Sequence, residues 1–118
     1  MQSRGGVRIA ERLDHIRDAI RQIEFLLSDK DLASLAADRL ARAAFERFLE
    51  IISEASRHVP AEMKALEPDV AWRDIAAIGN HLRHTYEQID IGILWDIHAA
   101  GQLASLDAAV ARLAEKLG

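Results

Sequence analysis

The sequence contains no cysteine among its 118 residues, which excludes disulfide bonds and thiolate metal sites. Two prolines and six glycines leave few interruptions to regular secondary structure. Aromatic residues make up 5% of the chain, so its core must be mainly aliphatic. No apolar run approaches the roughly 18 residues of a membrane-spanning helix, and the N-terminal residues lack the apolar segment of a secretory signal. Together these absences predict a cytoplasmic protein that does not enter a membrane.

Positive charge is also scarce, because 15 lysines and arginines face 19 aspartates and glutamates, for a net charge of -4. Phosphate neutralisation supplies most of the affinity of a non-specific nucleic-acid binder, so this chain cannot hold long nucleic acid by its overall charge. Any contact with RNA must be local, for example at a positive cleft that more than one subunit builds. Two arginines near the N-terminus, Arg4 and Arg8, are too few to form a basic arm.

Half of the residues are apolar and 29% are charged, which are the proportions of a globular protein. The length fits a single domain over residues 1–118, in which we expect residues 1–6 to be flexible. Apolar residues recur every three or four positions in four stretches, the pattern of amphipathic helices. These stretches are residues 9–27, 31–58, 70–85 and 91–117. No segment alternates with period two, so we predict an all-α fold, an antiparallel up-down bundle of four or five helices.

A few residues define the breaks between the predicted helices. Pro60 ends the second helix, because the residue before a proline disfavours the α conformation. A kink near Ser34 within that helix is left open. Asp90 is placed to cap the N-terminus of the fourth helix, and Gly101 is expected to bend or split it.

The predicted helix over residues 70–85 has an apolar face that contains a glycine. At about 100° per residue, positions three or four apart share one face. The members of this face are Trp72, Ile75, Gly79, Leu82 and Tyr86. Glycine costs about 1 kcal/mol relative to alanine within a helix, and its usual compensation is the close approach of another backbone. We therefore expect another segment to pack tightly at Gly79.

A polar stripe lies beside this apolar face. Arg73, Asn80 and His84 cluster on the stripe, and Arg83 lies between it and the apolar face, one turn beyond Gly79. Histidine can transfer a proton near neutral pH, and arginine can hold a phosphate with two hydrogen bonds. Together they could cleave RNA without a metal ion. A capping and salt-bridge arrangement is the more common role of such a pair at the end of a helix.

Three passages resemble the HepT-like proteins of the HEPN superfamily. They are RLARAAFERFLEIISEASRHVP, with an Ile-Ile-x-Glu-Ala centre at residues 51–55, WRDIAAIGNHLRHTY at residues 72–86, and IDIGILWDI at residues 89–97. The second passage resembles the family signature, Trp-Arg-x-Ile followed by Arg-Asn-x-x-x-His-x-Tyr. The resemblance implies a helical bundle that forms homodimers. It also implies metal-independent ribonuclease activity at the dimer cleft, without a cofactor.

Many members of that family are toxins, and each is neutralised by a minimal nucleotidyltransferase that adds AMP to the motif tyrosine. By position in the signature, Asn80 matches the family asparagine and His84 the catalytic histidine. Tyr86 matches the tyrosine that receives AMP. The resemblance therefore implies a toxin that cleaves RNA and an antitoxin that modifies it.

Gly79 departs from the family pattern, because the signature has arginine at this position. One hypothesis is that Arg83 contacts the phosphate instead, with a side chain that reaches back along the helix, while Asn80 and Arg73 position the substrate. The alternative is that the chain is a non-catalytic helical module that binds and regulates a partner nucleotidyltransferase.

Carboxylates also gather on the preceding predicted helix, where Glu46, Glu50 and Glu54 are spaced by four residues. The absence of a Glu-x-x-His motif there argues against a metal site. Glu50 and Glu54 are instead placed to pair with Arg73 or Arg83 and so to orient the site. Three further histidines are isolated in the sequence and receive no role. They are His15, His58 and His98.

Overall fold

The computed structural model describes residues 4–84 and 90–117, which form seven helical segments. In chain order they are α1 (Arg4–Leu27), α2 (Leu32–Ala37), α3 (Arg39–Arg57), α4 (Ala61–Lys64), α5 (Trp72–His84), α6 (Ile91–Ala99) and α7 (Gln102–Leu117). The all-α prediction is confirmed for this part of the chain. The number of segments differs from the predicted four or five, because two predicted helices are divided and the long connection contains the one-turn helix α4.

Aspartate side chains set the beginnings of three helices. Asp31 and Ser34 form a capping box at α2, in which Asp31 Oδ1 accepts a hydrogen bond from the Ser34 backbone N–H at 2.8 Å. Asp38 ends α2 and caps α3, where it accepts a hydrogen bond from the Ala41 N–H at 3.0 Å. The second predicted helix therefore breaks at Asp38 and not at Ser34. Asp90 caps α6 as predicted, accepting a backbone N–H hydrogen bond at 2.8 Å.

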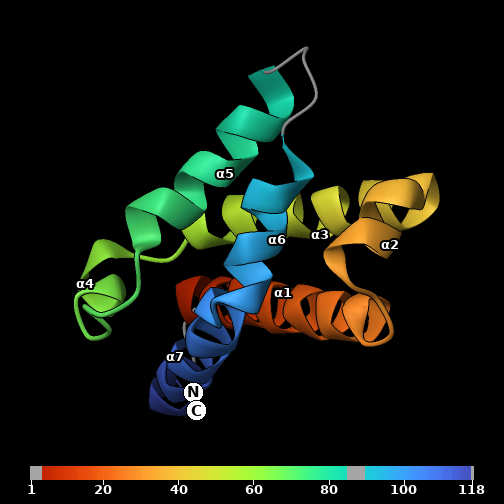
Figure 1. The fold of residues 1–118 in the computed structure, drawn as a ribbon. Helices are drawn as coiled ribbons and strands as arrows, with labels where there is room; N and C mark the ends of the chain where they lie inside the picture. The colour runs from red at the N-terminus through yellow and green to blue at the C-terminus, as the bar shows by residue number, and fades with distance from the viewer. Residues whose placement is uncertain (1–3, 85–89, 118) are drawn as a thin grey trace.

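Gly101 separates α6 from α7, as the sequence predicts. Its φ of +81° lies in the left-handed region, which residues with a Cβ rarely adopt. The two helices consequently follow each other as a bent column, which crosses α1 in Figure 1.

The core is built around α1 and α3. α1 packs against α3 and α7, and α3 lies between α1 and α5 (Figure 1). The fully buried side chains are mainly aliphatic, as the composition predicts, and Phe45 of α3 is the only aromatic one among the described residues. None of the helices in the described ranges is both long and apolar enough to cross a bilayer. Where α3 and α5 pack together, Arg57, Asn80 and Arg83 remain exposed to solvent.

Candidate active site

α5 carries most of the predicted site residues, and its apolar face decides which way they point. Ile75 and Gly79 are buried, and Trp72 and Leu82 are half-buried. This is the face that helical periodicity predicts, and it packs against α3. The polar positions beside Gly79 are thereby left on the surface, next to the contact between the two helices.

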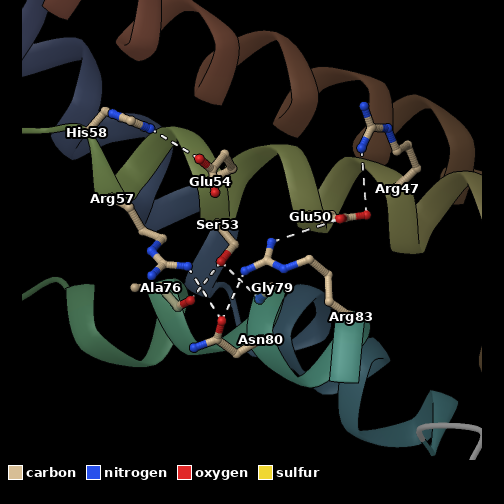
Figure 2. A network of polar contacts seen from close by, with 10 residues as sticks. All are labelled: Arg47, Glu50, Ser53, Glu54, Arg57, His58, Ala76, Gly79, Asn80 and Arg83. Atoms are coloured by element: carbon tan, nitrogen blue, oxygen red, sulfur yellow. Dashed lines mark hydrogen bonds and ion pairs between the residues drawn. The ribbon is translucent and has the colours of Figure 1, made fainter. Parts of the chain in front are cut away.

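Ser53 of α3 explains the glycine in this face. Its hydroxyl donates a hydrogen bond to the Ala76 carbonyl oxygen at 2.9 Å and accepts one from the Gly79 N–H at 2.9 Å (Figure 2). A Cβ atom at position 79 would lie 2.8 Å from Ser53 Oγ and 3.2 Å from Ser53 Cβ. The tight packing predicted at Gly79 is confirmed, but the neighbour is a buried side chain and not a backbone.

The Arg83 guanidinium lies directly over Gly79. Its Nη1 atom is 3.1 Å from the position that a Cβ atom at residue 79 would take. Nη2 donates a hydrogen bond to Asn80 Oδ1 at 3.0 Å, and Nη1 lies 4.0 Å from Glu50 Oε1 (Figure 2). The side chain therefore reaches back by one turn. The guanidinium charge lies next to residue 79, the position at which the family signature has arginine.

Asn80 brings two guanidinium groups together. Its Oδ1 atom also accepts a hydrogen bond from Arg57 Nη1 at 3.5 Å, so Arg57 of α3 and Arg83 of α5 converge on one amide oxygen (Figure 2). Two positive charges held this close repel each other. An anion that accepts hydrogen bonds from both would relieve the repulsion, and phosphate has the geometry for such contacts.

The carboxylates of α3 take different partners. Glu50 lies within ion-pair distance of Arg83, so one of the predicted pairings is confirmed. Glu54 pairs instead with His58, whose Nε2 lies 3.1 Å from Glu54 Oε1. The hydrogen bond with His58 holds the pKa of Glu54 below its usual value, and the positive charges of Arg57 and Arg83 lower it further.

Three other predicted site residues lie along or beyond α5. Arg73 is exposed in the first turn, about 15 Å along the helix axis from Arg83, so it does not join the network of described contacts. His84 is the last residue of α5, one turn beyond Asn80. Tyr86 lies outside the described residues.

The site presents positively charged hydrogen-bond donors, which suit an anion. Within residues 4–84 and 90–117, no three histidine, aspartate or glutamate side chains gather closely enough to hold a metal. The groups that converge beside Gly79 are instead hydrogen-bond donors with positive charge, from Arg57 and Arg83. A bound phosphate would accept hydrogen bonds from them at a site that His84 adjoins in the chain.

The all-α fold, with its polar site at the end of α5, is compatible with a HEPN-like helical domain. A family model described as Ribonuclease HepT-like matches residues 16–113, and the chain belongs to this family. The "Probable ribonuclease HepT" of Thermococcus cleftensis is 35% identical over 83 residues, which cover 70% of this chain and 76% of that protein. The "Putative RNase MJ1380" of Methanocaldococcus jannaschii is 36% identical over 84 residues, which cover 71% and 76%. No solved structure gives a significant match.

The sequence alone does not single out Ser53 or Arg57. Ser53 is the variable position of the Ile-Ile-x-Glu-Ala centre, and its signal is a small polar residue on the apolar side of α3. Paired with the glycine on the apolar side of α5, it marks a tight contact between the two helices. Arg57 has no local signal, because its partner Asn80 lies on another helix.

Proposed function

We propose that the protein is a metal-independent endoribonuclease and the toxin of a toxin–antitoxin pair. Arg83 is its phosphate-binding group, and His84 is its general acid and base. The observation that carries the proposal is the position of the Arg83 guanidinium above Gly79, because it supplies the charge that the family signature supplies through arginine. The Arg83 side chain is 34% exposed, so a phosphate can reach it.

The proposed reaction needs a base, an acid and a cation. The base removes the proton of a ribose 2′-OH, and the O2′ atom attacks the adjacent phosphorus. The bond from phosphorus to O5′ breaks as the acid protonates that oxygen, which leaves a 2′,3′-cyclic phosphate on one product. Arg83 stabilises the charge that develops on the phosphate oxygens. A homodimer would bring two copies of His84 to one cleft, one as the base and the other as the acid.

The proposed partner is a minimal nucleotidyltransferase antitoxin that modifies Tyr86. The transfer joins the tyrosine oxygen to the α-phosphorus of ATP and releases pyrophosphate. Tyr86 follows His84 by two residues, so the attached AMP would lie beside the catalytic groups and offer its own phosphate to Arg83. Mass spectrometry of the chain after incubation with this partner and ATP should show one added AMP on Tyr86. An unchanged mass with an active partner would remove this part of the proposal.

Gly79 and the contacts of Arg83 also favour a second candidate function. Asn80 and Glu50 already contact the Arg83 guanidinium. If these contacts persist, the guanidinium cannot bind a phosphate. The chain would then be a non-catalytic helical module that binds and regulates the nucleotidyltransferase.

Cleavage of labelled single-stranded RNA by the purified chain, free of any partner and with EDTA present, separates the two candidates. We expect the wild type to cleave, and we expect Arg83→Ala and His84→Ala each to lower the rate by about 100-fold or more. His81→Ala is the matched control, because His81 is an exposed histidine of the same helix with no contact in the described network. Absence of cleavage by the wild type on RNAs of varied sequence would favour the regulatory module.

A further inference from the structure

A groove leads from Arg83 along the side of α1. Two adjoining hollows make up this groove, with volumes of about 350 Å³ and about 650 Å³, and both are lined by Arg12 and His15. The first hollow lies among α1, α3 and α5 and includes Arg83. The second continues along α1 to Arg8 and to His58 at the end of α3. Residues from three separate helices thus line the two hollows, which share Arg12 and His15.

This groove is locally positive in an acidic protein. Its walls hold four arginines and three glutamates, which are Arg8, Arg12, Arg47, Arg83, Glu11, Glu50 and Glu54. Two of the glutamates are already engaged, Glu50 with Arg47 at 3.6 Å and Glu54 with His58 at 3.1 Å. Arg8 and Arg12 form no ion pair with any residue that the structure describes. Their charges are therefore available to an anion in the groove.

The two arginines without a described ion pair, Arg8 and Arg12, form a row with His15 that leads toward the proposed cleavage site. Arg8, Arg12 and His15 follow the spacing of one helical face and span about 10 Å along α1. A row of this kind matches the repeating phosphates of an extended strand better than a single compact anion. The matched region of the family begins at residue 16, so all three residues precede it.

We propose that this groove binds the backbone of single-stranded RNA on one side of the phosphate that Arg83 holds. Arg8 and Arg12 contact successive phosphates of that segment. The identity of the phosphate at Arg83 rests on the proposed ribonuclease function, whereas binding along α1 does not depend on cleavage. Local charge of this kind allows a chain of net charge -4 to hold RNA, because screening limits the repulsion from distant carboxylates.

Binding of a labelled 2′-O-methyl oligonucleotide, measured by fluorescence anisotropy across a range of salt concentrations, tests the proposal. This RNA cannot be cleaved, because it has no free 2′-OH. Arg12→Gln should weaken binding about fivefold, the loss of one exposed ion pair. It should also lower the slope of log affinity against log salt by about 0.7, the value for one phosphate contact on a single strand. Arg12→Lys, which keeps the charge, should retain the slope.

Arg21→Gln is the matched control. Arg21 is an exposed arginine of the same helix, but it lies on the opposite side of α1 from Arg12 at about 100° per residue. Its replacement should leave both the affinity and the slope unchanged. If Arg12→Gln and Arg21→Gln change the affinity and the slope equally, RNA binding in the groove is refuted, even if the wild type cleaves RNA. Weakened binding by Arg12→Gln alone, with a wild type that cleaves no RNA, would support the groove and refute the ribonuclease function.

Discussion

Replacement of Gly79 with alanine tests the contact on which the position of Arg83 depends. In an open helix this change stabilises by about 1 kcal/mol, the difference in helix propensity. Here the new Cβ atom would lie 2.8 Å from Ser53 Oγ and 3.2 Å from Ser53 Cβ. Overpacking of a buried contact costs about 1–3 kcal/mol. The unfavourable contact outweighs the propensity, so we expect Gly79→Ala to lower the free energy of unfolding by about 1 kcal/mol.

A double-mutant cycle with Ser53→Ala separates the two effects. Urea unfolding followed by circular dichroism, at one protein concentration for all variants, gives each free energy. Ser53→Ala alone should cost about 1 kcal/mol, because it removes the hydrogen bonds with Ala76 and Gly79. In that background the Cβ atom added by Gly79→Ala no longer meets a hydroxyl at residue 53, and its remaining close neighbours are the Cβ of residue 53 and the flexible end of Arg83. The change should therefore be close to neutral. The two changes should therefore be coupled by about 1 kcal/mol.

The same cycle has a functional readout. The Cβ atom at residue 79 would also lie 3.1 Å from Arg83 Nη1, so it would push the guanidinium away from its present place. Ribonuclease activity of Gly79→Ala should fall below that of the wild type. Two results would refute the close contact between α3 and α5. One is a Gly79→Ala variant that is more stable than the wild type by the full difference in helix propensity. The other is additive changes in unfolding free energy for Gly79→Ala and Ser53→Ala.

Three further predictions concern the fold. Phe45→Ala should cost about 3–5 kcal/mol in the same unfolding assay, because the ring is fully buried, and a loss under about 1 kcal/mol would contradict its place in the core. Gly101→Ala should cost about 1 kcal/mol, because its φ of +81° strains any residue with a Cβ, and an unchanged stability would argue against this turn. Hydrogen bonds from Arg112 hold the pKa of Glu67 below its usual value of 4.5. Stability should therefore be lost as the pH falls from 4.5 through the lowered pKa, and less so in Glu67→Gln, whereas parallel pH profiles would contradict the pairing.

Much of the helical architecture follows from short-range patterns. The end of α1 at Leu27, the cap at Asp90 and the break at Gly101 each depend on residues within one or two turns. The choice between Ser34 and Asp38 as the break in the second predicted helix does not follow from such patterns. Both regions offer a capping residue, and Asp38 proves to end one helix and begin the next.

The candidate site also has features that follow from local sequence and features that only the tertiary structure determines. Periodicity along one helix was sufficient to place Asn80 and Arg83 beside an apolar face interrupted by Gly79. Only the tertiary structure decided that Ser53 occupies the space at that glycine and that Arg57 shares the oxygen of Asn80. These contacts join different helices, and they depend on how far apart the helices lie and how each is rotated about its axis.

The groove along α1 shows this difference most clearly. Each of its arginines is an ordinary charged residue of an amphipathic helix, and the sequence alone assigns no role to Arg8 or His15. Local sequence determined that they would face away from the core. Only the packing of α1 and α5 against α3 brought them into line with Arg83, because side chains on separate helices become neighbours only when those helices pack.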